Sequence, residues 1–307
     1  MRHDPYRLHQ SGVAIISAML LTALALSVVA SLFWQQQVQV RSIDNQRLQL
    51  QKQWVLRGAF DWAGMILSED LRNSETDHLS EIWASPLADT KLDSFLGKNT
   101  QGAASQANLS GSITDAQGRL NLNNLAKTSA VNLAEVRAFQ RLLRRLQLKP
   151  ELALNTARTI AASQQRRASG SMTVLPLSSA DDLLLVPGFS ELSVTLLRPF
   201  VIFLPRSTGV NVNTAPAEIL MARVASLSES EAVTLIASRR IASFRDINDF
   251  LTRLPGKTMN LDEGEISVSS EFFLVSGRIT IDHTSQRTEG LIERQRAGTR
   301  LVWARQG

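Results

Sequence analysis

The residue types that perform most enzymatic and metal chemistry are scarce in this chain. It has no cysteine, which excludes disulfides, thiolate metal sites and cysteine nucleophiles. Of its four histidines, His3 and His9 precede a long apolar run, and His78 and His283 lie far apart in the sequence. Histidine-based metal sites and catalytic triads are therefore not expected. No nucleophile lies beside a base and no phosphate-binding loop is present, so we predict that the chain is not an enzyme and needs no cofactor.

Carboxylates are the remaining metal ligands to consider. Calcium prefers clustered oxygen ligands, and Asp181 and Asp182 form an adjacent acidic pair. Two carboxylates in a row are better explained as the start of a helix, where negative charge is favourable. We therefore predict no metal site.

The elements that position these residues begin with a membrane segment. Residues 13–34 form an apolar run without a charged residue, long enough to cross a bilayer core as a helix of roughly 20 residues. Its polar interruptions are small hydroxyl side chains: Ser17, Thr22, Ser27 and Ser31. We predict a transmembrane helix over residues 13–34.

Two alternatives to this interpretation are a secretory signal peptide and a plain single-span anchor. A signal peptide could be cut before Ser31, because Val28 and Ala30 would serve as the small residues that precede such a cut. The apolar stretch continues past that point through Trp34 into further helical sequence. A cut before Ser31 would therefore divide one continuous element.

A long helix is expected to continue beyond the membrane segment. No proline occurs from Tyr6 to Ser85, and apolar residues recur mostly three and four apart, at Val40, Ile43, Val55, Ala59, Trp62, Ile66 and Leu67. Residues 13–70 as one helix would be about 87 Å long. A coiled-coil stalk fits less well, because glutamines interrupt any heptad pattern over residues 35–53.

Two regions have the alternation of strands. Residues 111–125 predict a hairpin around the turn at residues 115–118, followed by asparagines that satisfy backbone groups: Asn121, Asn123 and Asn124. Residues 265–306 predict three antiparallel strands that complete the same sheet. Residues 77–84, before the first strand region, predict a capped loop held by a buried Trp83.

Residues 129–256, between the two strand regions, have helical character. Residues 131–148 predict an amphipathic helix with Leu133 on its apolar face, and residues 164–179 read as a polar loop. Further helices are expected over residues 228–239 and 244–254. Thr214 is a suitable N-cap for a helix with Pro216 in its first turn.

The first residues resemble the class III leader of type IV pilins and type II secretion pseudopilins. That leader ends in a glycine directly before an apolar helix, as Gly12 does before Val13. In that class the prepilin peptidase cleaves after the glycine and methylates the new N-terminus. The resemblance therefore implies cleavage after Gly12 and methylation of Val13. Most pilins carry glutamate at the fifth mature position, whereas this chain has Ser17.

Further segments resemble the minor pseudopilin K family, also called GspK. They are the DHLxExWA segment at residues 77–84, GRLNLNNL at residues 118–125 and NVNTAP at residues 211–216. The missing glutamate at Ser17 is also a feature of this family. Some members bind calcium through acidic residues in an inserted helical domain, but the corresponding residues here, 154–172, contain no acid. This departure agrees with the prediction of no metal.

The resemblance implies an α+β fold. A pilin-like long N-terminal helix would pack on an antiparallel sheet, with a large inserted all-α domain of the SAM or helix-hairpin-helix kind. The implied divisions are a leader (1–12), a transmembrane helix (13–34), the first part of the head (35–127), the inserted α-domain (128–256) and the C-terminal strands of the head (257–307).

The resemblance also implies a function in assembly. A minor pseudopilin of the type II secretion system forms the tip complex of the periplasmic pseudopilus with the minor pseudopilins I and J, and is needed for pseudopilus assembly and for export of folded exoproteins. The implied partners also include the prepilin peptidase and the inner-membrane assembly platform. Basic residues flank both ends of the apolar run, so the leader decides the orientation. We expect a single-pass inner-membrane protein with its bulk in the periplasm.

The alternative is a membrane-anchored helix-hairpin-helix protein that binds DNA, as in competence systems. Such a hairpin needs a glycine-containing turn, usually backed by Lys or Arg, whose N–H groups approach phosphates. Residues 222–228 contain no glycine, and Gly188 is flanked by Asp181, Asp182 and Glu191. Removing the leader reduces 33 basic and 28 acidic residues to 31 and 27, a formal charge of only +4. We therefore expect no nucleic-acid partner.

Overall fold

The computed structural model describes residues 10–91, 107–169, 175–254, 264–281 and 284–306. Predictions about His3, His9 and His283 lie outside the described residues. The chain divides into two units, residues 1–55 and residues 56–307. Each unit is described by itself.

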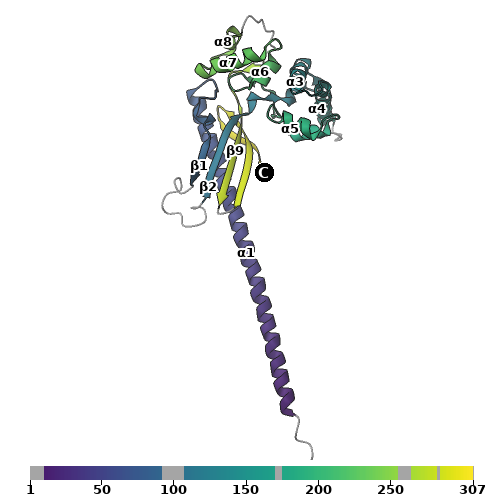
Figure 1. Ribbon diagram of the computed structural model, residues 1–307, viewed down its shortest axis with the longest axis vertical. Coiled ribbons are helices and arrows are strands. Elements are labelled where there is room, and N and C mark those ends of the chain that lie inside the picture. The colour runs from purple at the N-terminus through teal and green to yellow at the C-terminus, as the bar shows by residue number, and fades with distance from the viewer. Residues whose placement is uncertain (1–9, 92–106, 170–174, 255–263, 282–283, 307) are drawn as a thin grey trace, which may run out of the picture. The chain divides into compact units, whose positions relative to one another are not determined.

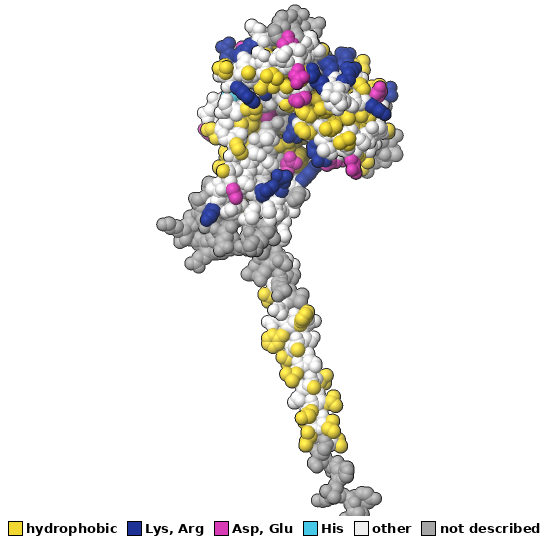
Figure 2. All heavy atoms as spheres, viewed as in Figure 1, with side chains coloured by type: hydrophobic (Ala, Val, Ile, Leu, Met, Phe, Trp, Pro, Cys, Tyr) yellow, Lys and Arg dark blue, Asp and Glu magenta, His cyan; other side chains and the backbone are white. Residues whose placement is uncertain are grey.

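The described part of the first unit is helical. Helix α1 runs Gln10–Asn73 without a break, which confirms the prediction of one continuous helix, and its residues up to Val55 belong to this unit. Val13–Gln37 is a candidate membrane span of 25 residues; its apolar 18-residue window has a mean hydropathy of 2.5, and no residue in that window is buried. Figure 2 shows hydrophobic side chains along this part of α1. One N-terminal helix of this kind fits a single-pass membrane anchor.

The second unit contains a five-stranded antiparallel sheet in the order β1-β2-β9-β10-β11. The strands are β1 (Leu87–Lys91), β2 (Ala107–Asp115), β9 (Phe272–Ile281), β10 (Thr284–Gln295) and β11 (Gly298–Gln306). The three C-terminal strands complete the sheet that begins before them, as the sequence predicts. Figure 1 shows β2 and β9 side by side although more than half of the second unit's sequence lies between them.

Residues 56–73 of α1 pack on one face of this sheet. Side chains alternate between the two faces of a strand, and those on this face form a core with the helix: Phe60, Ala63, Leu67, Trp83, Ile113, Phe273, Val275 and Ile292. A 3-10 helix, Ile82–Ala84, carries Trp83 into this core. The Trp83 ring meets Phe273 edge to face, with centroids 5.2 Å apart. The capped loop held by a buried Trp83 is therefore confirmed.

The opposite face of the sheet is apolar only near the end of β2 and the start of β9. There Ala116, Phe272, Leu274 and Leu291 pack against residues 202–204, which enter from the helical part of the chain. Apolar side chains on one face of the sheet therefore pack against α1, and apolar side chains on the other face attach the helical domain.

The helical domain lies between β2 and β9 in the sequence. Its α-helices are α3 (Leu133–Arg145), α4 (Glu151–Ser169), α5 (Glu191–Leu197), α6 (Ala217–Arg223), α7 (Glu229–Ile241) and α8 (Ile247–Thr252). It also holds three pairs of two-residue strands: β3 (Leu120–Asn121) with β6 (Val201–Ile202), β4 (Ala126–Lys127) with β5 (Ala130–Val131), and β7 (Val210–Asn211) with β8 (Ile266–Ser267). One hydrophobic core joins its helices. The α+β fold with a helix on an antiparallel sheet and a helical insertion is confirmed.

The predicted hairpin over residues 111–125 is wrong. Strand β2 ends at Asp115, a 3-10 helix follows at Ala116–Gly118, and β3 then pairs with β6 rather than with β2. Ile113 consequently lies in the core under α1, whereas Leu120 and Leu122 lie in the core of the helical domain. The short alternation resembled a hairpin because the turn residues also suit the exit of the chain from a sheet.

Three local predictions in the helical domain also need correction. Leu133 is 60% exposed rather than on the buried face of α3. The first residues of the expected loop, 164–169, continue α4. Thr214 does not cap α6, whose N-cap is Pro216. Its hydroxyl donates instead to Asp115, 2.6 Å away, because a buried carboxylate is the stronger acceptor.

We predict that Gly290→Ala destabilises the second unit. A Cβ at Gly290 would lie 2.5 Å from Cε1 of Phe60 and 3.1 Å from the carbonyl oxygen of Trp303, and such overpacking costs about 1–3 kcal/mol. The control is Gly58→Ala in α1, where nothing lies within 4 Å of the added Cβ and helix propensity should raise stability by about 0.5–1 kcal/mol. Thermal unfolding of the full chain in detergent measures both. Equal melting temperatures for the two variants would contradict the packing described.

Candidate functional site

The residues of the expected processing site lie at the start of α1. Gly12 and Val13 are both within the helix, which begins at Gln10. The hydroxyl of Ser17 donates to the carbonyl oxygen of Val13, 2.7 Å away. The position that carries a charged glutamate in most pilins therefore holds a neutral group that is already bonded within its own helix. Cleavage after Gly12 stays a prediction.

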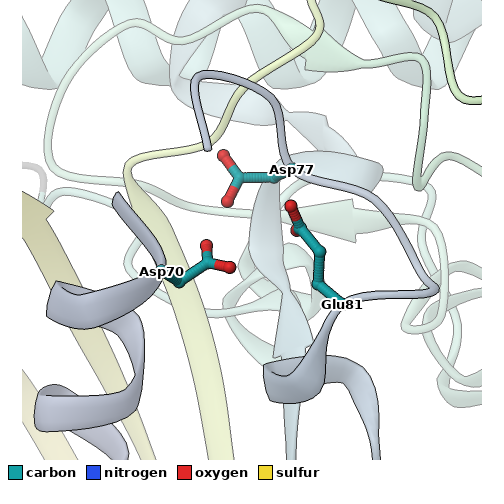
Figure 3. Close-up of side chains that lie close together, drawn as sticks. All are labelled: Asp70, Asp77 and Glu81. Carbon is teal, nitrogen blue, oxygen red and sulfur yellow. The ribbon is translucent and has the colours of Figure 1, made fainter. Parts of the chain in front are cut away.

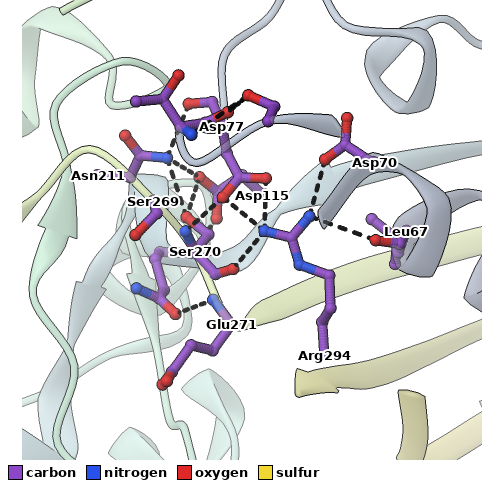
Figure 4. A network of polar contacts seen from close by, with 12 residues as sticks. Leu67, Asp70, Asp77, Asp115, Asn211, Ser269, Ser270, Glu271 and Arg294 are labelled. Carbon is purple, nitrogen blue, oxygen red and sulfur yellow. Dashed lines mark hydrogen bonds and ion pairs between the residues drawn. The ribbon is translucent and has the colours of Figure 1, made fainter. Parts of the chain in front are cut away.

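A second candidate site is a buried polar junction in the second unit. We define it as Asp70 of α1, Asp77 after α1, Asp115 at the end of β2, Asn211 of β7, Ser270 before β9 and Arg294 of β10 (Figure 4). These residues come from segments that are distant in the sequence. They meet where α1 ends, where β2 ends and where β9 begins.

Arg294 is the cation of the junction, and only 3% of its side chain is exposed. One guanidinium nitrogen lies 2.8 Å from Oδ2 of Asp70, and the other lies 2.6 Å from both carboxylate oxygens of Asp77. It also donates to the carbonyl oxygen of Ser270, 2.8 Å away. The guanidinium lies 4.7 Å from the centre of the Phe273 ring. Arg294 therefore binds the end of α1 and the loop after it to the sheet.

Asp115 joins β2 to the helical domain. Its Oδ1 accepts from the backbone N–H of Gln117, which caps the 3-10 helix after β2. Its Oδ2 accepts from Asn211, Ser270 and Thr214, at 2.9, 2.7 and 2.6 Å. Both oxygens of this buried carboxylate thus accept hydrogen bonds, as burial requires.

Burial raises the pKa of all three carboxyls in the junction, that of Asp77 against the opposing effect of Arg294. The pKa of Asp70 is raised to about 6 by burial and then by the nearby Glu81 and Asp77, while Arg294 acts in the opposite direction. The pKa of Asp115 is raised to about 6 by burial, against the hydrogen bonds from Thr214, Ser270 and Gln117. Asp70 and Asp115 therefore change their charge in mildly acidic solution.

Three acids beside the junction have the composition of a cation site. Carboxylate oxygens of Asp70, Asp77 and Glu81 lie within 4.8 Å of one another (Figure 3), and calcium binds such oxygens. Arg294 already donates to two of the three and supplies the positive charge that a metal would bring. Oε2 of Glu81 accepts from Trp83 and from the backbone of His78. Two of the three acids are therefore already paired with the guanidinium, and the third is bonded within its own loop.

The acidic pair in the helical domain serves helix geometry. Asp181 pairs with Arg198, and Asp182 accepts from the backbone N–H groups of Ser178 and Ser179, which lowers the pKa of its carboxyl against the effect of burial. A 3-10 helix, Ala180–Leu185, starts at this pair. The interpretation of Asp181 and Asp182 as a helix start is confirmed.

His78 is the one described histidine. Its Nδ1 lies 3.0 Å from the hydroxyl of Ser80, and its Nε2 lies 3.7 Å from Oε1 of Glu81. The order of these groups is that of a Ser-His-acid relay, but 3.7 Å is longer than a hydrogen bond. All three residues belong to one short loop that also anchors Trp83. The contact is consistent with loop stabilisation.

The asparagines of GRLNLNNL bind backbone groups, as the sequence predicts. The amide of Asn121 donates to the carbonyl oxygen of Arg206 and accepts from the N–H of Leu204. Asn123 donates to Leu204, and Asn124 exchanges two hydrogen bonds with Thr208. These side chains bond to backbone groups as a neighbouring strand would. They thereby hold the start of the helical domain to residues 204–208.

Comparison with known proteins points to one family. Two family models, both described as type II secretion system (T2SS), protein K, match residues 118–206 and 210–269. The type II secretion system protein K of Pseudomonas aeruginosa PAO1 is 29% identical over 324 aligned residues, which cover 96% of this chain and 92% of that protein. These matches support the type II secretion system protein K family for this chain.

A solved structure of this family has the same fold. It is described as the GspK-GspI-GspJ complex from the enterotoxigenic Escherichia coli type 2 secretion system. The similarity has a TM-score of 0.65 at 22% identity and covers 87% of this chain and 99% of that chain. In this chain, Asn121 lies in the first matched segment and Asn211 in the second. Both matched segments thus contribute to the attachment of the helical domain.

The sequence did not reveal the junction. Arg294 belongs to no local motif. Asn211 begins the NVNTAP segment, Asp115 begins the predicted turn and Asp77 begins the loop before Trp83, but none of these patterns indicates that the residues meet. The available signal was the alternation of β10, which places Arg294 on the same face of the strand as the buried Ile292. A charged residue at such a position indicates a buried partner.

We predict that Arg294→Met strongly destabilises the second unit. Removing the guanidinium leaves Asp77 and Asp70 buried without their cation, which costs about 3–5 kcal/mol. The control is Arg300→Met, because the Arg300 side chain is 68% exposed and its partner Glu293 keeps a second arginine, Arg206; an exposed pair contributes at most about 1 kcal/mol. Chemical denaturation of the full chain compares the two. Similar losses for both variants would refute the role of Arg294.

The raised pKa of Asp70 predicts a pH-dependent stability. The folded pKa of about 6 exceeds the ordinary value of 3.8, so the folded state holds a proton that the unfolded chain has released. This stabilisation is complete below about pH 4 and is lost as the pH rises through about 6. We expect the free energy of unfolding to fall over this window, and to fall less in Asp70→Asn. Asp61→Asn, on the exposed side of α1, should keep the full fall; an unchanged slope in Asp70→Asn would show that Asp70 does not titrate there.

Proposed function

We propose that this chain is a minor pseudopilin of the type II secretion system. In this proposal it joins the minor pseudopilins I and J in the tip complex of the periplasmic pseudopilus. Residues 13–34 anchor it in the inner membrane with the bulk in the periplasm, and the inner-membrane assembly platform receives it after the prepilin peptidase has cleaved behind Gly12. It acts through assembly that supports export of folded exoproteins, and not through catalysis.

The observation that carries this proposal is the similarity to protein K of P. aeruginosa along 96% of the chain. A match of that extent covers the apolar helix as well as the head. The E. coli structure with the same fold is a complex of GspK with GspI and GspJ. That composition supports I and J as the partners of this chain.

The place of the helical domain supports a position at the tip. Within the second unit the domain attaches where α1 ends at Asn73, through the junction around Asp115 and Arg294. In a pilus, the next subunit would stack beyond that end of the helix. A large domain there obstructs stacking. Ser17 agrees with this position, because a subunit at the distal end has no subunit ahead whose N-terminal amine needs a carboxylate.

DNA binding, the alternative function, has less support. The connection between α6 and α7 contains no glycine, and α7 starts with Glu229 and Glu231, the latter closing a capping box with Ser228. Acids at this helix N-terminus would repel phosphate. Gly188 does adopt a positive φ of 101°, but Glu191 begins the helix directly after it.

We predict that the mature chain begins at N-methylated Val13. Mass spectrometry of the N-terminal peptide from membranes of the native host measures this. Gly12→Val should block cleavage, keep Met1 and abolish secretion, because the membrane helix would retain a polar leader. Ser11→Ala is the control that should be processed normally. A terminus at Ser31, or normal secretion by Gly12→Val, would contradict the proposal.

A further inference from the structure

One surface of the sheet has a composition that its own packing does not explain. We call it the serine-arginine face: Ser110, Ser112, Ser276, Arg278, Arg287 and Arg305. Its direction follows from neighbouring glycines. A Cβ at Gly277 would lie 3.8 Å from Leu56 of α1, and one at Gly290 would touch Phe60. Side chains alternate along a strand, so Arg278 and Arg287 point away from α1.

Two arginines stand directly opposite each other on this face. Arg278 of β9 pairs in register with Arg287 of β10, and both are exposed. Like charges directly opposite on neighbouring strands destabilise a sheet. Within the described residues, no hydrogen bond or ion pair joins either guanidinium to a carboxylate. The repulsion between them is therefore not relieved by a described part of the chain.

One acid on this face, Glu289, has other cations near it. Glu289 stands directly opposite Arg305 on β11. Burial lowers the pKa of the half-buried Arg119, and the charge of Glu289 acts against that effect. Three arginines of the face, Arg278, Arg287 and Arg305, accompany this one glutamate. The pair Arg278 and Arg287 keeps an excess of positive charge.

The side chains next to the arginines on this face are small and polar. The hydroxyls of Ser112 and Ser276 lie 2.9 Å apart across β2 and β9, and Ser110 stands directly opposite Arg278. Small side chains allow another backbone to approach closely. The apolar contact with the helical domain lies on the same face but closer to the start of β9, at Leu274 and Leu291. The serine-arginine face is therefore suited to a charged, hydrated contact rather than to an apolar one.

We propose that the serine-arginine face docks a carboxylate-rich surface of a neighbouring pseudopilin. Charge complementarity carries the inference, because a carboxylate placed between Arg278 and Arg287 would bond to both and remove their repulsion. Arginine forks bind carboxylates in a fixed bidentate geometry, and the strands hold these two in register. A flexible lysine-rich segment, typical of attraction to anionic lipid, is not what this face presents. The inference rests on the proposed function, since it assumes a pseudopilin neighbour.

The test uses the full chain co-purified with the host's I and J subunits in detergent. Arg278→Glu/Arg287→Glu should weaken the association about tenfold or more and reduce its dependence on salt. Arg278→Lys/Arg287→Lys keeps the charge and should lose less. Arg245→Glu, at a side chain 84% exposed just before α8, is the control for charge reversal and should associate normally.

A single reversal separates docking from folding. Arg287→Glu places opposite charges across the strands, so the free chain should melt about 1–2 °C higher while its association weakens. A variant that is destabilised and weakly associated would show a structural role and overturn the inference.

The remaining outcomes are also decisive. If the native chain associates with I and J but the double reversal associates equally well, the docking inference is wrong and the proposed function stands. If the native chain fails to associate with either subunit, the proposed function fails and the inference with it. If the double reversal leaves I and J unaffected but abolishes binding to vesicles that contain anionic phosphatidylglycerol, the face binds lipid instead.

Discussion

The head of this protein depends on the buried charge of Arg294. A guanidinium in the interior is unfavourable unless its charge and its N–H groups are satisfied. Here the carboxylates of Asp70 and Asp77 and the carbonyl oxygen of Ser270 satisfy it. These groups belong to the end of α1, the loop after it and the residues before β9. The requirement of one side chain thus fixes where three segments lie on the sheet.

Attachment of the helical domain follows a related rule. The domain leaves the sheet after Asp115 and returns before Phe272, and both points contain polar groups that burial deprives of water. Asn211 donates to Asp115, to Ser270 and to the carbonyl oxygen of Asp77, and is itself fully buried. Asn121 and Asn124 hold residues 204–208 beside the first turn of the domain. The apolar contact of residues 202–204 with Phe272 and Leu274 completes the attachment. An inserted domain with such a junction is held by the sheet at both of its ends.

Much of this architecture was predictable from the sequence because it follows local periodicity. The apolar run from Val13 and the absence of proline predicted α1, and alternation after residue 265 predicted β9 to β11. The prediction of a hairpin at residues 111–125 was wrong because strand pairing depends on residues distant in the sequence. Strand β2 pairs with β9, and β3 pairs with β6. Thr214 failed as a cap for a similar reason, since a carboxylate about a hundred residues away competed for its hydroxyl. The junction could not be predicted, because no spacing in the sequence indicates that Asp77 and Arg294 meet.

The central claim is that the chain acts as an assembly component of type II secretion. The most direct measurement is to delete its gene in the native host and to measure secreted proteins in the medium and in the periplasm, with the full chain supplied from a plasmid as the complement. The account predicts that folded exoproteins accumulate in the periplasm, and that the full chain restores their release. Unchanged secretion in the deletion strain would contradict it.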